Sequence, residues 1–150
     1  MAVSGTPRYL LDTNAASALI RGAGSQPLQD LVIEYGACIS VITEAELRFG
    51  IVRRPEATRL AKAVENFLQD IPVLPWTSAT AKVYANLRAR MEIRGLSLSA
   101  MDLLIAAHAL TEDCTLVSAD KVFAHVPGLR VLDWSASSAT RKAAKSPKAS

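Results

Sequence analysis

The chain has 150 residues, and half of them are hydrophobic, which suits one ordinary domain with a sizeable core. Its longest apolar stretch, MDLLIAAHAL, is interrupted by Asp102 and His108 and falls well short of the roughly 20 apolar residues of a membrane-spanning helix. The first residues, MAVSGTPRY, lack the basic start and apolar run of a signal peptide, so we expect a soluble protein.

The net charge of +3 arises in residues 135–150, which read SASSATRKAAKSPKAS and carry no acid. Without their four cations the chain has 13 basic and 14 acidic residues, so the remainder is close to neutral. We predict a folded domain over residues 1–134 and a disordered basic tail over residues 135–150, because the tail lacks large apolar side chains. The tail can contact nucleic acid by charge alone or simply aid solubility, and the sequence leaves both open.

Short apolar runs and helical patterns alternate along the chain. The runs predict strands at residues 8–12, 37–43, 71–76, 114–120 and 129–134. Three-to-four spacing of apolar residues predicts a helix from Ala57 to Ile71, with Pro55 suited to its first turn. Similar spacing predicts a second helix around residues 83–91, stopped by Gly95, and a third around residues 104–108. The alternation predicts an α/β fold with a parallel sheet.

The two cysteines, Cys38 and Cys114, lie in apolar, β-branched runs. No Cys or His spacing typical of a zinc site accompanies them. We interpret both as reduced core residues, which fits a cytoplasmic protein.

Acids stand where the apolar runs end or helices begin. Asp12 and Asp120 each close a predicted strand, so they would share the carboxyl edge of a parallel sheet, where sites form in such folds. Glu46 follows the second strand, and Asp102 begins the alanine-rich helix. Each acid has a structural alternative: Thr43 with Glu46 and Ser99 with Asp102 have capping-box spacing. Asp12 and Asp120 also fit turns or caps, with Asn14 as a cap of the next helix.

Caps and turns do not explain why one acid occurs at each of four otherwise apolar segments. Carboxylates gathered together repel one another unless a cation binds between them. Mg²⁺ and Mn²⁺ prefer oxygen ligands, and such ions activate water and polarise phosphate oxygens. The pattern therefore favours metal-assisted phosphodiester hydrolysis.

The motifs LLDTN, SVITEAELRFG, LSAMDLLIAAHAL and LVSADKVFAHVPGLRVLDW, in this order, resemble those of the PIN-domain family, and within it the VapC-type toxins. The resemblance spans about residues 8–134. It implies an α/β/α sandwich around a parallel sheet of about five strands. It also implies Mg²⁺- or Mn²⁺-dependent endoribonuclease activity on RNA, often tRNA or ribosomal RNA, which inhibits translation. The implied partners are a VapB-type antitoxin, which binds operator DNA, and a second toxin copy in a homodimer.

The resemblance assigns the acids by position. Asp12, Glu46 rather than Glu44, and Asp102 match the family's acids, and Asp120 stands where many relatives have Asp or Asn. Two small polar residues match as supporting groups, Asn14 and Ser118. The sequence departs after Asp120, where KVF replaces a longer stretch that often holds another acid.

The arginines and His108 can each be explained without a role in catalysis. Arginines follow Glu46 (Arg48, Arg53 and Arg54) and recur in LRARMEIRG (Arg88, Arg90 and Arg94), where they can line an RNA groove or form solvated faces. His108 lies on the predicted core face of its helix, so we interpret it as a core or interface histidine and not as a catalytic base.

Two rival functions remain at this point. A HAD-like phosphatase also begins with an acid after its first strand, but it needs a second Asp where this chain has Asn14. A non-catalytic PIN-fold module would bind RNA or an antitoxin without cleavage, and the presence of all four acids argues against it.

Overall fold

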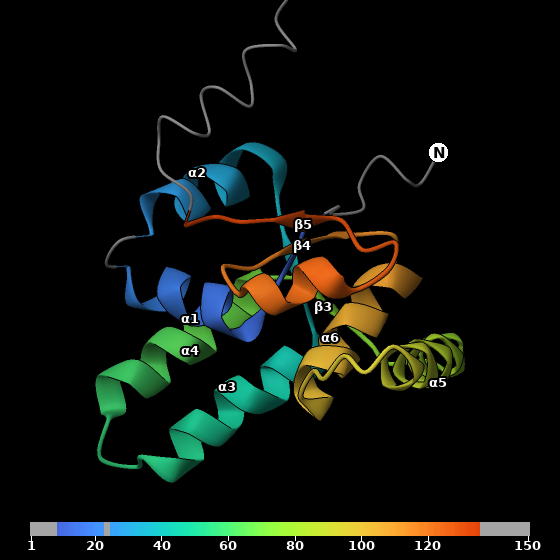
Figure 1. Ribbon diagram of the computed structural model, residues 1–150. Coiled ribbons are helices and arrows are strands. Elements are labelled where there is room, and N and C mark those ends of the chain that lie inside the picture. Colours follow the sequence, from blue (N-terminus) through green and yellow to red (C-terminus); the bar gives the residue numbers. More distant parts are fainter. Residues whose placement is uncertain (1–8, 23–24, 136–150) are drawn as a thin grey trace, which may run out of the picture.

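A parallel sheet forms the centre of the molecule (Figure 1). The computed structural model describes residues 9–22 and 25–135, so the predicted tail lies outside the described residues except for Ser135. In this part of the chain the strands are β1 (Tyr9–Leu11), β2 (Cys38–Ser40), β3 (Val73–Leu74), β4 (Thr115–Val117) and β5 (Val131–Leu132). Their order is β3-β2-β1-β4-β5 with parallel pairing throughout, which confirms the predicted α/β fold.

Helices cover both faces of the sheet. On one side are α1 (Thr13–Arg21), α2 (Gln26–Tyr35) and α4 (Thr58–Asp70), and on the other are α5 (Ser78–Ile93) and α6 (Ala100–Thr111). In Figure 1, α1 and α4 lie to the left and α5 and α6 to the right. The helix α3 (Val41–Arg53) continues directly from β2, and the short 3₁₀ helix η2 (Lys121–His125) follows β4. The layers form the expected α/β/α sandwich.

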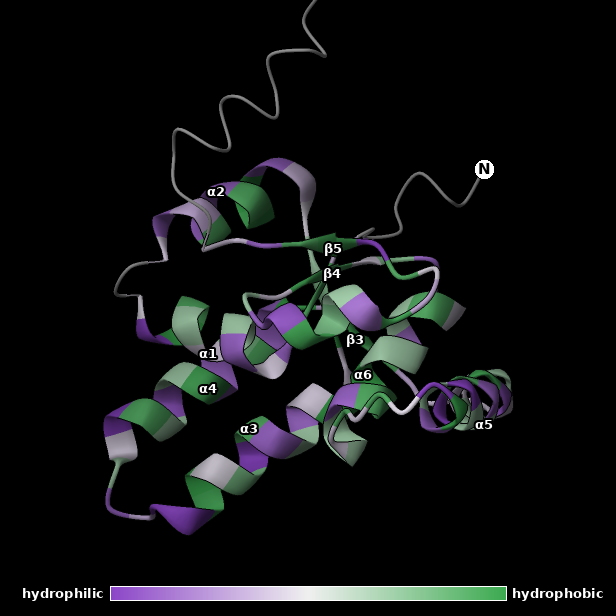
Figure 2. Ribbon diagram, in the orientation of Figure 1, coloured by the Kyte–Doolittle hydropathy of each residue, from purple (hydrophilic) through white to green (hydrophobic). Residues whose placement is uncertain are grey.

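Successive strand residues point into two separate cores, as the two-residue period of a strand requires. Leu10 and Leu116 pack with α5 and α6, whereas Leu11 and Val117 pack with α1, α2, α3 and α4. All four side chains are fully buried. Figure 2 shows the central strands as hydrophobic, whereas hydrophobic and hydrophilic residues alternate along the outer helices α3, α4 and α5. Burial on both faces explains the nearly continuous apolar runs of the sequence.

Polar side chains begin the helices that leave the carboxyl edge of the sheet. Asp12 caps α1 immediately after β1, and Ser40, the last residue of β2, caps α3. Ser99 caps α6, as its sequence position predicted, and Asp120 caps η2. Each cap accepts a hydrogen bond from a backbone N–H that would otherwise lack a partner in the first turn. The strands therefore turn into helices abruptly, which fixes the cap residues at this edge.

Several predicted boundaries were wrong. All five strands are shorter than predicted, and the strand expected over residues 37–43 ends at Ser40 because α3 already begins at Val41. Thr43 is therefore a buried residue inside α3 and does not form the expected cap. Asn14 does not cap α1 either, because the Asp12 side chain occupies that role. Pro55 precedes α4, which begins only at Thr58.

The other helix predictions are confirmed, and one helix was missed. α5 and α6 occupy the predicted regions, and Gly95 follows α5 with a φ of +70°, a conformation that favours glycine. The sequence prediction overlooked α2, although Pro27 lies in its first turn. Both cysteines are buried and free, as expected. None of the helices within residues 9–22 and 25–135 has the length and apolar character needed to cross a bilayer.

Candidate metal-dependent nuclease site

Asp12 is a carboxylate held almost out of solvent at the carboxyl edge of the central strand. Its side chain is only 6% exposed, and its Oδ1 accepts a hydrogen bond from the backbone N–H of Ala15 at 2.7 Å. Burial raises the pKa of Asp12 above its ordinary value, while the hydrogen bonds from Ser118 and Ala15 oppose this shift. The charges of Asp102 and Asp120 raise this pKa further. No positive charge in the described part of the chain offsets these effects on the pKa of Asp12.

Asp102 and Asp120 belong to the same electrostatic group as Asp12. Asp102 is half-buried in the first turn of α6, where burial and the charge of Asp120 raise its pKa and a hydrogen bond with Ser99 lowers it. Asp120 is exposed, and its Oδ1 accepts a hydrogen bond from the N–H of Val122 at 3.0 Å. Asp120 is thus both a helix cap and a neighbour of two other carboxylates, so the two alternatives for this residue do not exclude each other.

Ser118 links Asp12 to Asp120. It is 1% exposed at the end of β4, and its Oγ accepts a hydrogen bond from the backbone N–H of Asp120 at 3.0 Å. Its side chain also hydrogen-bonds Asp12 and lowers the pKa of that carboxyl. This position suits the supporting role expected for Ser118. Asn14, the other expected supporting residue, is exposed in the first turn of α1, and it forms no hydrogen bond with the acids among the described residues.

Glu46 stands apart from the three aspartates. It lies on the second turn of α3 and lines a cavity of about 330 Å³ between α1, α3 and α4. Its charge is not among those that raise the pKa of Asp12 or Asp102. Among the described residues, no three His, Cys, Asp or Glu side chains lie close enough together to hold one metal ion. The three aspartates therefore form an electrostatic group, and Glu46 is not gathered into it.

The donor chemistry of this group nevertheless fits a hard divalent cation. The side chains offer carboxylate oxygens, which Mg²⁺ and Mn²⁺ prefer, and no sulfur or imidazole ligand accompanies them in the group. Since the charges of Asp102 and Asp120 raise the pKa of Asp12, a cation between the carboxylates would favour its ionised form. Mg²⁺ also retains several waters, so it does not require a closed protein cage.

A hydroxyl contact that the sequence did not reveal joins α1 to α3. Thr13, directly after Asp12, has its Oγ1 3.2 Å from Oγ1 of the buried Thr43. Thr13 also lines the same cavity as Glu46. The contact therefore connects the start of the helix that Asp12 caps to the helix that carries Glu46. No spacing rule links two threonines so far apart in the chain, so sequence analysis had no signal for it.

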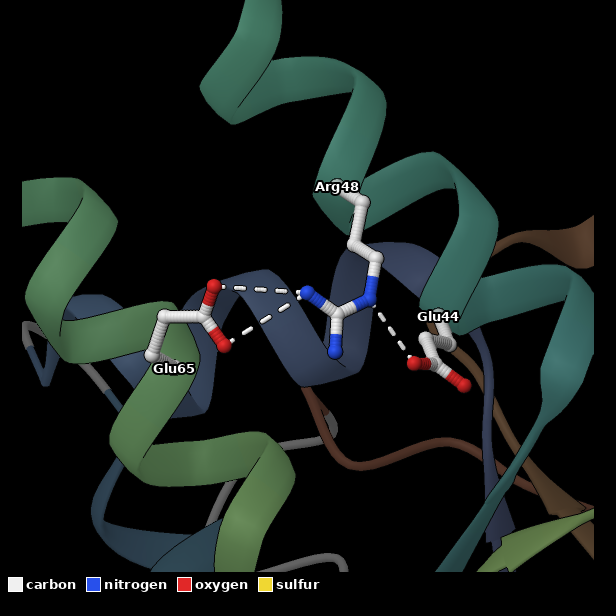
Figure 3. A network of polar contacts seen from close by, with 3 residues as sticks. All are labelled: Glu44, Arg48 and Glu65. Atoms are coloured by element: carbon white, nitrogen blue, oxygen red, sulfur yellow. Dashed lines mark hydrogen bonds and ion pairs between the residues drawn. The ribbon is translucent and has the colours of Figure 1, made fainter.

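The arginines in and next to α3 differ in whether they already form an ion pair with an acid. Arg48 Nε lies 2.8 Å from Glu44 Oε2, and its Nη1 lies 3.3 Å from Glu65 Oε2 on α4 (Figure 3). Arg53 and Arg54 line the cavity, and neither forms an ion pair within the described part of the chain.

Two further arginines also differ in whether they form an ion pair. Arg21 also lines the cavity and forms no ion pair with any described residue. Arg88 resembles Arg48 instead, because it pairs with Glu92 on the same helix at 3.2 Å. Three arginines without an ion pair to a described residue therefore line the same cavity as Glu46.

Comparison with known proteins places this chain in a family. The family model described as PIN domain matches residues 9–129. The chain belongs to the PIN-domain family. This PIN domain is 30% identical over 130 residues to the ribonuclease VapC2 of Rickettsia felis, a match that covers 84% of this chain and 97% of the relative. It is 29% identical to the tRNA(fMet)-specific endonuclease VapC of Shigella flexneri, covering 85% and 98% of the two chains.

Solved structures give the same result for the fold. This PIN domain matches a chain in the crystal structure of DNA-bound VapBC from Salmonella typhimurium with a TM-score of 0.78 and 27% identity, covering 86% of this chain and 99% of that one. It matches a chain of the DNA-bound VapBC2 structure from Rickettsia felis with a TM-score of 0.75 and 28% identity, covering 83% and 96%. The similarity to VapC-type proteins thus extends over nearly their whole length.

Proposed function

We propose that this PIN domain is a VapC-type endoribonuclease toxin that hydrolyses phosphodiester bonds of RNA with the help of Mg²⁺ or Mn²⁺. The observation that carries the proposal is the aspartate group at the carboxyl edge of the sheet, with Asp12 buried and its charge offset by no cation of the described residues. The similarity to proteins named ribonuclease VapC2 and tRNA(fMet)-specific endonuclease VapC supports the choice of RNA as substrate.

The four acids named from sequence would hold the metal: Asp12, Glu46, Asp102 and Asp120. When bound, the ion supplies an activated water and offsets the charge that develops on the phosphate. The chain itself keeps the ligands in place. The Ala15 N–H and the Ser118 hydroxyl orient the Asp12 carboxylate, and Ser99 does the same for Asp102. Glu46 would complete the ligand set from α3 by a change of side-chain rotamer.

Positive charge beside Glu46 supports binding of the RNA backbone. Arg21, Arg53 and Arg54 surround the cavity beside Glu46 and are not neutralised by ion pairs with described residues. The guanidinium of Arg53 lies 5.3 Å from the ring centroid of Phe49, which holds it on the same face of α3. These side chains would contact phosphates of single-stranded or loop RNA, with tRNA or ribosomal RNA as targets.

We further propose a VapB-type antitoxin as the partner that neutralises the toxin. Chains similar to this one occur in solved VapBC complexes, and two of those complexes are bound to DNA. Operator DNA would be contacted only through the antitoxin complex. A homodimer of the toxin is part of the same proposal, and size-exclusion chromatography with light scattering tests it.

Incubation of purified protein with total RNA tests the activity. We expect cleavage with Mg²⁺ or Mn²⁺, no cleavage with a chelator, and no cleavage by Asp12→Asn prepared in parallel, which also controls for contaminating ribonucleases. Metal-independent binding without cleavage would instead support the non-catalytic module. A phosphorylated Asp12 trapped during phosphatase assays would revive the HAD-like alternative. Mapping of RNA 5′ ends after induction in cells then identifies the target.

A further inference from the structure

His108 is a fully buried polar residue on an otherwise apolar stretch of α6, between the buried Ala107 and Ala109. Both of its ring nitrogens have partners. Nδ1 lies 2.7 Å from Oγ of Ser40, and Nε2 lies 3.1 Å from the carbonyl oxygen of Pro75. The Trp76 ring packs edge-on against the imidazole, with centroids 5.6 Å apart. The expectation of a satisfied core histidine is confirmed.

The partners fix the direction of every hydrogen bond in this group. The carbonyl of Pro75 can only accept, so Nε2 carries the hydrogen. Burial lowers the pKa of His108 and favours the neutral ring, so Nδ1 accepts from the Ser40 hydroxyl. Ser40 Oγ accepts in turn from the N–H of Ile42 at 3.0 Å. A directional chain therefore runs from the first turn of α3, through Ser40 and His108, to Pro75.

This chain joins elements that carry candidate metal ligands. Ser40 caps α3, which holds Glu46 on its second turn. His108 lies on α6 six residues after Asp102, about 9 Å further along the helix axis. On its opposite side, the first turn of α3 contacts α1 through the hydroxyls of Thr43 and Thr13. The start of α3 is thus attached both to the helix that bears Asp102 and to the helix that Asp12 caps.

Burial of the polar imidazole of His108 costs free energy that burial of an apolar side chain would not. A leucine or methionine would fill a similar volume without two hydrogen-bond partners, whereas an unsatisfied imidazole would be strongly destabilising. A fully satisfied buried network favours one relative arrangement of the elements that it joins. We propose that His108 is a positioning residue, which through Ser40 fixes the start of α3 relative to α6 and so the separation of the Glu46 and Asp102 carboxylates. This inference rests on the proposed function, which assigns both carboxylates to one site.

Two substitutions separate the two hydrogen bonds of His108. The short amide of His108→Asn reaches the Nδ1 position and can keep the contact with Ser40. The longer amide of His108→Gln reaches the Nε2 position and can keep the contact with Pro75. Because small displacements of ligands are costly for catalysis, we expect kcat for Mn²⁺-dependent RNA cleavage to fall by about tenfold or more in His108→Gln and by less than about threefold in His108→Asn, with KM little changed.

A matched pair of helix caps distinguishes positioning from general stability. Ser40→Ala removes the α3 cap together with the contact to His108. Thr77→Ala removes the equivalent cap of α5, a helix that carries none of the candidate ligands. We expect both variants to lower the melting temperature but only Ser40→Ala to lower kcat. Assays run at a temperature at which circular dichroism shows every variant fully folded.

A measurement that does not depend on activity completes the test. Nuclear magnetic resonance should show the Nε2–H tautomer of His108 and faster amide hydrogen exchange at Ile42 and Thr43 in His108→Gln than in His108→Asn. Equal exchange in the two variants, or equal losses of kcat, would overturn the inference. If the wild-type protein does not cleave RNA, the proposed function fails, and the exchange rates still decide whether His108 holds the start of α3.

Discussion

Ser118 at the end of β4 hydrogen-bonds the buried Asp12 at the end of the neighbouring strand β1, and its hydroxyl also accepts from the N–H of Asp120. One small side chain therefore orients one candidate ligand while it fixes the backbone of another. The pairing of β1 with β4 sets this geometry, because Leu11 lies opposite Val117 and the residues that follow emerge side by side. The buried Asp12 lies at the centre of this arrangement.

Asp12→Asn should abolish cleavage without unfolding the protein. The amide cannot supply a charged ligand, but its oxygen can still accept from the Ala15 N–H and cap α1. We expect activity to fall more than about a hundredfold in Mg²⁺ or Mn²⁺, since the metal must be held to activate water. Circular dichroism should be unchanged, and full activity in this variant would refute the assignment of Asp12.

The same residue should make stability depend on pH. Its raised pKa means that the native state binds the proton more tightly than the unfolded chain, so unfolding releases protons and stability falls as pH rises from 3.8 through the native pKa. Asp12→Asn should therefore melt at a higher temperature than the wild type at neutral pH in a chelator. The gap should close below pH 3.8, and thermal melts across pH measure it. A constant gap would show that Asp12 is not the cause.

Glu46 and Glu44 offer a matched comparison on α3. Glu46→Gln should reduce cleavage by about tenfold to a hundredfold, the range expected when a metal site is weakened. Glu44→Gln removes only the solvent-exposed ion pair with Arg48, which contributes little, and should leave cleavage within about twofold. Titration of the activity with Mn²⁺ should show a higher metal requirement for Glu46→Gln alone. The reverse ranking would assign the ligand to Glu44.

We expect Arg53 and Arg54 to contact RNA, and Arg48 to serve only in its ion pairs. Combined substitution of Arg53 and Arg54 by Ala should weaken RNA binding and lower the slope of log affinity against log salt by about 1 to 2, one unit or less for each lost phosphate contact. Arg48→Ala should leave that slope unchanged, because Glu44 and Glu65 already engage its guanidinium. Filter binding of Asp12→Asn protein to RNA over a salt series measures both without cleavage.

The sequence predicted the parallel sheet and the positions of Asp12, Asp102 and Asp120 at element boundaries, because continuous apolar runs and the residues that end them are local signals. Glu46 lies instead on the second turn of α3. The sequence predicted Thr43 instead of Ser40 as the cap of α3, because the short β-branched run between these residues suits a strand or a helix equally. It also gave no measure of how far Glu46 lies from the aspartates. That separation depends on where α3 packs against α1 and α6, which long-range contacts decide.

The order of the strands also has a consequence for the synthesis of the protein. The central strand β1 is made first, yet one of its two neighbours, β4, comes from late in the chain, as do Asp102, Ser118 and Asp120. Parallel pairing of such distant segments requires closure of a long loop, so it cannot precede translation of the final strands. A ribosome that translates this message therefore carries Asp12 and Glu46 without their partners until Asp102, Ser118 and Asp120 have been translated. If the protein cleaves RNA as proposed, its own ribosome is spared until then.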